Sequence, residues 1–459
     1  MFIRAMPLGL PAALAFLSLF AAAPATAETQ TLEQALVLCY RNNPGLQARR
    51  AELKAMDERV SQAMSGWRPS IDAVAGAGKA YQELSGKGML TGTDTLTPRE
   101  AGITIKQPLF RGFRTENEVK AAEAMVRAGR AGLLNAEQQL LFDTAKAYLD
   151  VLQNRAVLEL TRNNEEVLGK QLEAVKERFR IGEVTKTDLS QSEARLNAAA
   201  AARIKAEGGL ADARAAFLRL VGDEPGDLRR PDISIELPQS GDEAAALAEK
   251  NHPAVIAAEF SRDAAEFDVK TADGALLPEI DLVGNVSRGW ERSLFVPGRQ
   301  DDAVIMARLT MPLYRSGADY SRARAARQTS VQRRLELEDK RRAARELAVR
   351  SWQSLMTARA AIAAHKTEIA AAELALHGVM EESRAGTRTI LDVLNAEQEL
   401  LDAKVNLVKA EHDEAVAILQ LKFSIGSLTA ESMKLPVEIY DPSLHYKGVR
   451  GKWIGAGGD

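Results

Sequence analysis

The polar residues with the most distinctive spacing lie in two short, similar segments. Each has an arginine, a glycine two positions later, a threonine after three more and an aspartate after another three. The first set is Arg180, Gly182, Thr185 and Asp188, and the second is Arg384, Gly386, Thr389 and Asp392. Glycine permits the left-handed backbone of a tight turn, and threonine and aspartate cap helices. The spacing therefore predicts two helix-to-helix turns. Their polar residues would act through hydrogen bonds and charge.

No residue pattern is typical of catalysis or of metal binding. The histidines lack the i, i+4 pairing with an intervening glutamate that helical metal sites use. They are His252, His365, His377, His412 and His445. There is no phosphate-binding glycine loop and no nucleophile elbow, and the single cysteine, Cys39, cannot form an internal disulfide. The sequence predicts a protein that is not an enzyme and that uses no cofactor or metal.

Composition and charge indicate an exported and largely helical protein. Hydrophobic residues make up 46% of the 459 residues but aromatic residues only 5%, as in long packed helices. The net charge of −3 provides no general attraction to nucleic acid. Residues 1–27 have the features of a cleaved signal peptide: Arg4, an apolar run over 8–20 and a small-residue site over 25–27. No later stretch is apolar for the ~20 residues that a membrane helix needs.

Beyond residue 27 the chain consists of two copies of one unit. Asn43-Pro44 and His252-Pro253 each predict the start of a helix, and the same spacing then leads to Pro69 and Pro278, where strand-like segments begin. Long proline-free segments follow and predict coiled-coil helices of roughly 100 Å. The predicted parts are a first repeat over 28–222 (strand pair 69–110, helical hairpin 113–222), a connector over 223–240, a second repeat over 241–427 (strand pair 278–314, hairpin 317–426) and a tail over 428–459.

The strand-like segments alternate small apolar with polar residues, most clearly over 303–311, whereas 85–98 is rich in Gly, Thr and Ser and predicts a loop. Each segment has about the ~9–11 residues of a tilted membrane strand. Four strands cannot close a barrel, and an open sheet in lipid would leave its edge groups unsatisfied. Three chains would pool twelve strands, an even number. The alternative is a small soluble sheet that caps a helical bundle.

Four features together resemble a known family. They are the duplicated unit, the Asn-x-Pro helix starts, the two glycine tips and the Pro-Leu-Phe/Tyr-Arg strand ends at 108–111 and 312–315. Over residues 28–427 the chain resembles the TolC family of outer-membrane efflux and secretion channels. The resemblance implies a mainly α fold with a β-barrel portion. Coiled-coil hairpins would form a periplasmic tunnel, and four strands per chain would form a twelve-stranded barrel in a homotrimer. The connector and the tail would contribute to an equatorial collar.

The resemblance also implies partners: a periplasmic membrane-fusion adaptor, an inner-membrane ABC or proton-driven transporter, and outer-membrane lipid around the barrel. The adaptor would dock on the tips, at Gly182, Glu183, Gly386 and Thr387. The family's other branch has a lipid-accepting cysteine at the mature N-terminus, and this sequence has none there. That difference favours type I protein secretion, with multidrug efflux as the alternative. A periplasmic adaptor or scaffold is a further alternative.

In that family an arginine after the tip glycine holds the periplasmic end closed by bonding to a Thr-Asp pair of the other repeat. The matching positions are Arg388, Thr187 and Asp188. The alternative is that Asp188 is only a helix cap and Arg388 a solvated tip residue. The family also has two lumen-facing aspartates three residues apart. Here they are Asp392 and Asn395, so the resemblance implies a single ring of carboxylates and weaker cation selectivity.

Overall fold

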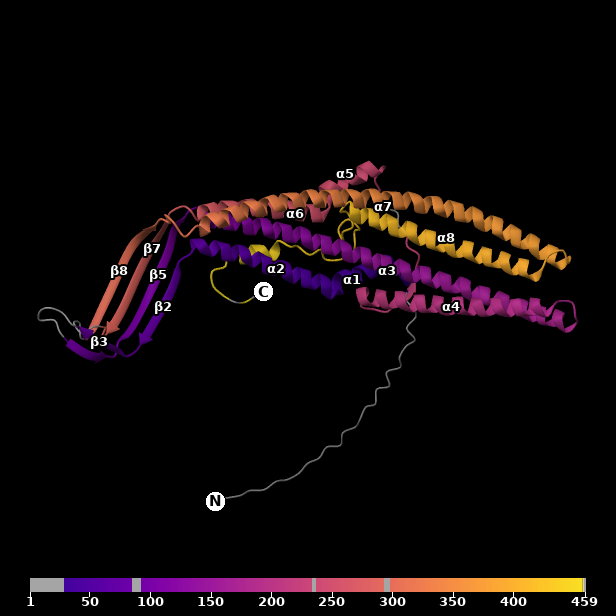
Figure 1. Cartoon of the computed structure of the whole chain (residues 1–459), viewed down its shortest axis with the longest axis horizontal. Coiled ribbons are helices and arrows are strands. Elements are labelled where there is room, and N and C mark those ends of the chain that lie inside the picture. Colours follow the sequence, from indigo (N-terminus) through magenta and orange to yellow (C-terminus); the bar gives the residue numbers. More distant parts are fainter. Residues whose placement is uncertain (1–28, 85–91, 233–236, 293–297, 456, 458–459) are drawn as a thin grey trace, which may run out of the picture.

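The computed structural model describes residues 29–459 apart from 85–91, 233–236, 293–297, 456 and 458–459. The predicted signal peptide, residues 1–27, lies outside the described residues. The molecule is long and narrow (Figure 1). A four-stranded sheet stands at one end, and two helical hairpins reach their tips at the other end.

Two helices of 67 residues each run most of the way between the sheet and the tips. At 1.5 Å per residue each is about 100 Å long. Their partners change along their length: shorter helices pack on them near the sheet, and the returning helices pack on them near the tips. The long helices are α3 (Arg114–Arg180) and α7 (Ala318–Arg384), the shorter ones α2 (Pro44–Met64) and α6 (Pro253–Gly274), and the returning ones α4 (Lys186–Val221) and α8 (Ile390–Ser424).

The predicted helix starts at the Asn-x-Pro segments are confirmed. α1 (Leu32–Asn42) ends before Asn43, whose side chain accepts hydrogen bonds from the first amides of α2. α5 (Gly241–Asn251) ends in the same way before His252, whose Nδ1 accepts from the amide of Ala254. In both repeats proline is the first helical residue, where its missing N–H costs nothing.

The sheet is antiparallel throughout, in the order β2-β5-β7-β8. Strands from the two repeats are therefore neighbours in one sheet. Strands β2 and β8 are its edges and have no further partner among the described residues. The strands are β2 (Ser70–Ala77), β5 (Arg99–Arg111), β7 (Glu279–Trp290) and β8 (Arg299–Thr310).

One loop prediction is wrong. Part of the segment predicted as a loop over 85–98 forms β4 (Gly92–Leu96), which pairs with β3 (Ala80–Leu84) and extends the end of the sheet away from the helices. Threonine favours extended backbone, and in this strand Thr93 and Thr95 alternate with other residues and lie opposite Glu83 and Tyr81. The abundance of Gly, Thr and Ser concealed that alternation.

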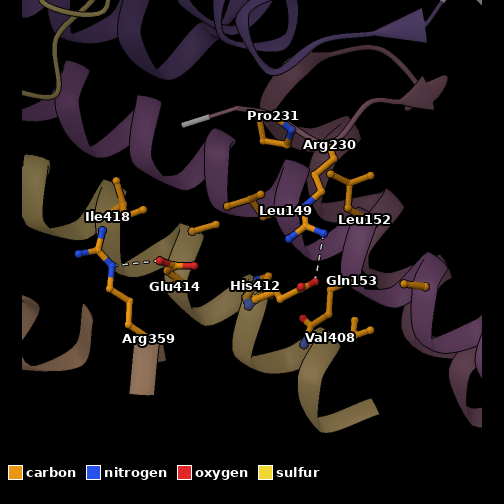
Figure 2. A pocket seen from close by; sticks show the side chains of 13 residues that line it. Leu149, Leu152, Gln153, Arg230, Pro231, Arg359, Val408, His412, Glu414 and Ile418 are labelled. Atoms are coloured by element: carbon orange, nitrogen blue, oxygen red, sulfur yellow. Dashed lines mark hydrogen bonds and ion pairs between the residues drawn. The ribbon is translucent and has the colours of Figure 1, made fainter. Parts of the chain in front are cut away.

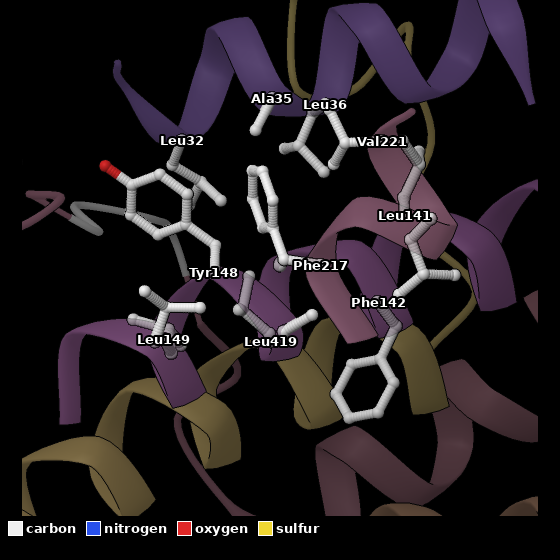
Figure 3. Packing of buried hydrophobic residues seen from close by; sticks show 14 of the residues in the cluster. Leu32, Ala35, Leu36, Leu141, Phe142, Tyr148, Leu149, Phe217, Val221 and Leu419 are labelled. Carbon is white, nitrogen blue, oxygen red and sulfur yellow. The ribbon is translucent and has the colours of Figure 1, made fainter. Parts of the chain in front are cut away.

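The largest apolar core lies midway along the molecule, where helices of both repeats meet (Figure 3). Phe217 of α4 and Tyr148 of α3 are both fully buried at its centre. The Tyr148 hydroxyl lies 2.8 Å from the carbonyl oxygen of Gln30 and 2.5 Å from that of Arg229. It thereby anchors the short parallel pair β1 (Thr29–Gln30) and β6 (Asp227–Leu228) to the core. Leu419 of α8 joins the same cluster, so the core ties the two repeats together.

The C-terminal tail lies along the sheet-proximal helices and includes the short helix α9 (Leu444–Val449). His445 Nδ1 lies 3.1 Å from the carboxylate of Asp57 on α2. The Tyr446 hydroxyl donates to Glu123 of α3 at 3.1 Å, and Arg450 pairs with the same carboxylate at 2.9 Å. These contacts fix the tail, for which the sequence shows no strong pattern, through side chains far away in the chain.

Candidate functional site

The two tips have the same construction. At the first, the backbone of Gly182 is left-handed, with φ at +81°, and its amide donates to the carbonyl of Phe179. At the second, Gly386 has φ at +78° and donates to Ser383. A side chain would strain this conformation, which explains the glycine at both tips. Ile181 is 70% exposed, so the tips present side chains to whatever approaches the end of the molecule.

Each returning helix begins with a complete capping box. The Asp188 carboxylate accepts from the amide and the hydroxyl of Thr185, at 2.9 and 2.7 Å. The Asp392 carboxylate does the same with Thr389, at 3.0 and 2.8 Å. These hydrogen bonds lower the pKa of both aspartates, so the two carboxylates stay ionised at neutral pH. The predicted capping role of the Thr-x-x-Asp spacing is confirmed.

Within one chain the structure does not bring Arg388 to Thr187 and Asp188. The Arg388 Nε donates to the carboxylate of Glu382 on its own hairpin, at 2.8 Å, and Asp188 is occupied by Thr185. Thr187 is exposed at the other tip, and the two tips stand apart (Figure 1). The contact between Arg388 and the Thr-Asp pair stays a prediction for the assembled closed end.

Asn395, the second predicted lumen position, joins the two hairpins. Its Oδ1 accepts from Nη2 of Arg195 on α4 at 2.6 Å. Nearby, Leu168 of α3, Ala199 of α4 and Leu394 of α8 form a small buried cluster. The two hairpins are therefore in direct contact near their tips.

The four main strands separate their side chains into two faces of different character. On one face Ile71, Ile105 and Ile305 lie in register across the sheet with Gly284, and the next row is Ala73, Ile103, Val286 and Ala303. The opposite face carries Asp72, Thr104, Asn285 and Ser287 among its members, and Asn285 donates to Thr104 at 3.0 Å. Lys106 and Asp281 form an ion pair of 2.9 Å on this polar face. One face therefore suits lipid and the other suits water.

A cavity of about 480 Å³ lies between α3, α7 and α8 near the middle of the molecule (Figure 2). His412 of α8 contacts Asp150 of α3 there at 2.7 Å. Burial lowers the pKa of His412, but the hydrogen bonds to Asp150 and Asp413 outweigh it and raise the pKa. At the rim Arg359 pairs with Glu414 and Arg230 with Glu411, both at 3.1 Å. The charged residues described in its lining therefore pair with each other or with neighbouring carboxylates.

Two kinds of feature are absent from the described residues. None of the helices in that part of the chain is long and apolar enough to cross a membrane. The same residues contain no group of three or more His, Cys, Asp or Glu side chains placed to hold a metal ion.

A family model described as "Outer membrane efflux protein" matches residues 35–223 and 244–427. The chain belongs to this family. The outer membrane efflux protein BepC of Brucella suis is 37% identical over 427 residues, 93% of this chain and 92% of BepC. The outer membrane protein TolC of Vibrio cholerae is 27% identical over 401 residues, 85% of this chain and 90% of TolC.

Among solved structures, the CmeC outer membrane channel of Campylobacter jejuni aligns with a TM-score of 0.78. The alignment covers 92% of this chain and 89% of CmeC at 15% identity, so the two chains share this fold despite a large difference in sequence. The chain is an export channel of the outer membrane, as the resemblance in sequence predicted. Its family is one of transport proteins.

One feature of this efflux protein was missed from sequence. Glu397 of α8 is only 9% exposed and accepts a hydrogen bond from Gln171 of α3 at 2.8 Å. Burial, partly offset by this hydrogen bond, raises its pKa to about 7. The heptad pattern of the sequence does indicate that Glu397 is buried. It falls on the same heptad face as Ile390, Leu394 and Leu401, where apolar residues are usual.

Proposed function

We propose that three copies of this chain assemble into one continuous duct from the periplasm to the cell exterior. The observation that carries this proposal is the two-faced sheet with open edges. Strands β2 and β8 run antiparallel to each other, so β8 of one copy can pair with β2 of the next without breaking the antiparallel order. Three copies then close a barrel of twelve strands, with the apolar face toward lipid and the polar face toward the lumen.

The helical hairpins extend this duct through the periplasm as a tunnel. Export by the predicted signal peptide, residues 1–27, would deliver the chain there. Leu228 of the connector over 223–240 and Leu428 and Leu435 of the tail over 428–459 belong to the central core, and the two segments form a collar around the tunnel. Their anchoring to α2 and α3 by Tyr148, His445 and Tyr446 supports this role.

The tips receive a periplasmic adaptor, which links the duct to an inner-membrane transporter that supplies the energy. Gly182 and Glu183 at one tip and Gly386 and Thr387 at the other are the docking residues. Their exposure supports this assignment. Each tip is narrow, so the individual contacts are weak and the six tips of a trimer bind together.

Small molecules are the proposed cargo, because the BepC protein, 37% identical along nearly the whole chain, is named an efflux protein. Type I protein secretion, which the sequence favoured, is the second candidate. Deleting the gene from its own host and measuring both dye accumulation and the proteins in the culture medium separates the two. Accumulated dye with unchanged secretion supports efflux, whereas lost secretion with unchanged dye efflux overturns it.

Arg388→Ser tests the duct and its gate together. If Arg388 bonds to Thr187 and Asp188 in the closed trimer, the serine variant should show several-fold larger time-averaged conductance in planar bilayers, because serine lacks the charged fork of donors. Arg384→Ser is the matched control, because Arg384 pairs with Glu381 of its own helix at 2.5 Å. Equal conductance in all three proteins would refute the gate assignment, and no conductance in any would refute the open duct.

A further inference from the structure

The contact between Glu397 and Gln171 contains two unexplained atoms. The Gln171 amide nitrogen donates to Oε1 of Glu397. The second carboxylate oxygen of Glu397, Oε2, and the side-chain oxygen of Gln171, Oε1, are both buried without a hydrogen-bond partner. Buried polar atoms without partners are rare and costly. An ionised carboxylate cannot remove this cost, because it has only acceptors to offer.

We propose that Glu397 is protonated when the two hairpins lie together, and that it locks α8 of the second hairpin to α3 of the first. A protonated carboxyl has one donor and one acceptor, as the amide of glutamine does at the same spacing. With the proton on Oε2, the acid donates to Gln171 Oε1 while the amide donates to Glu397 Oε1. One proton thus gives partners to both unpartnered oxygens and makes a two-bond link between the repeats.

Among the described residues no cation contributes to the pKa of Glu397, which burial and the Gln171 hydrogen bond determine. On α4, the guanidinium of Arg195 donates to Asn395 and not to Glu397. On α3, Lys170 pairs with Glu166 and Lys176 with Glu173. On the α7–α8 hairpin, Lys404 pairs with Glu373, and His377 of α7 is exposed. The neighbours of the pair are instead apolar, among them Leu168 and Leu394.

The link lies near the tips, where the proposed duct has its closed end, and its role as a gate element rests on that proposed function. Widening this end by moving α8 away from α3 breaks the pair and exposes Glu397 to water. Its pKa then returns from about 7 toward the ordinary value of 4.5. A pKa that is higher in the joined state favours joining at low pH, and this preference falls as the pH rises and is lost above about 7. The duct should therefore open more readily in alkaline medium.

Conductance as a function of pH tests the lock. Between about pH 5.5 and pH 8.5 the open-to-closed ratio in planar bilayers should rise about thirtyfold for each Glu397 that opening exposes to water. Glu397→Gln should remove most of this rise and stay closed, since two amides form the same two-bond pair without titrating. Glu399→Gln is the matched control, because Glu399 is an exposed carboxyl on the same helix and should behave as wild type. The proposal is overturned if Glu397→Gln keeps the full pH response.

A second readout does not depend on the protein forming a pore. Infrared difference spectra of the purified full-length protein should show the carbonyl band of a protonated carboxylic acid that disappears as the pH is raised through about 7. The band should be absent in Glu397→Gln and present in Glu399→Gln. A missing band in the wild type refutes the protonated lock even if the duct conducts. A titrating band in a protein without conductance upholds the lock and refutes the duct alone.

Discussion

At the scale of single residues, Asp392 combines two tasks. Its carboxylate closes the capping box of α8 through Thr389, and the same hydrogen bonds lower its pKa. A carboxylate that is fixed in position and ionised is suited to attract cations when symmetry repeats it around a lumen. Asn395, three residues further on, is neutral and is bound to Arg195, so Asp392 is the member of this pair that carries charge.

Replacing Asp392 with alanine should reduce cation preference, because it removes the proposed ring of carboxylates. The measurement is the reversal potential of single channels in a potassium chloride gradient. Thr389→Ala is the matched control: it weakens the same cap but keeps the charge, so its reversal potential should match that of wild type. A shift of equal size in both variants would assign the effect to the cap and not to the charge.

The sequence reveals a polar residue's role more readily when its partner lies close to it along the chain. The capping boxes were predicted because Thr185 and Asp188 lie three residues apart and bond to each other. Glu397 was missed because its partner, Gln171, lies 226 residues away and because Glu399, two residues on, is an ordinary exposed carboxyl. Composition alone does not distinguish the two glutamates. Only the heptad position of Glu397 does, and its meaning depends on which helix packs there.

At the scale of elements, the long helices are the part that sequence specifies best. Their apolar residues recur with helical spacing, and proline, glycine and the capping residues mark their ends. α3 ends at Arg180 and α7 ends at Arg384. In both hairpins a single residue separates the end of the helix from the tip glycine. Short strands are specified less well: β4 (Gly92–Leu96) has only five residues, and its pairing with β3 determines its conformation as much as its composition does.

Thr185→Ala should loosen the first turn of α4 by about 1 kcal/mol, the usual cost of losing an N-cap side chain. The amides at the start of α4 should lose roughly fivefold of their protection in native-state hydrogen exchange. Thr187→Ala is the control, because Thr187 is exposed in the same turn and its side chain takes no part in the capping box. Equal protection in Thr185→Ala and wild type would show that the hairpin, not the cap, holds this turn.

At the scale of the whole molecule, the two faces of the sheet differ in character, one apolar and one polar. The sequence alternation predicted that two kinds of face exist, but the order β2-β5-β7-β8, which brings strands of both repeats into contact, required the structure. The Arg388 contact belongs to this scale as well. One chain satisfies Arg388 locally through Glu382, so a bond to the other repeat depends on how three copies are arranged.

Ile305→Arg should impair assembly in the outer membrane, because it places a charge on the apolar face of β8 at a cost of about 2–4 kcal/mol near the bilayer centre. Val304→Arg is the matched control, since Val304 is its neighbour on the polar face. The yield of detergent-resistant trimer in outer-membrane fractions should fall for Ile305→Arg and stay near wild type for Val304→Arg. The reverse order would show that the two faces have been assigned the wrong way round.

The open edges of the sheet also have a consequence for the life of a newly made subunit. A lone chain exposes the unpaired backbone of β2 and β8 beside rows of isoleucine, and such edges readily join to other strands. A subunit that has not yet met its neighbours is therefore prone to pair these strands with the wrong chains. A subunit with a damaged β8 that still pairs through β2 would reduce channel number more than a missing subunit would. It would hold two intact copies in a ring that cannot close. A minority of faulty chains would therefore disable most of the channels.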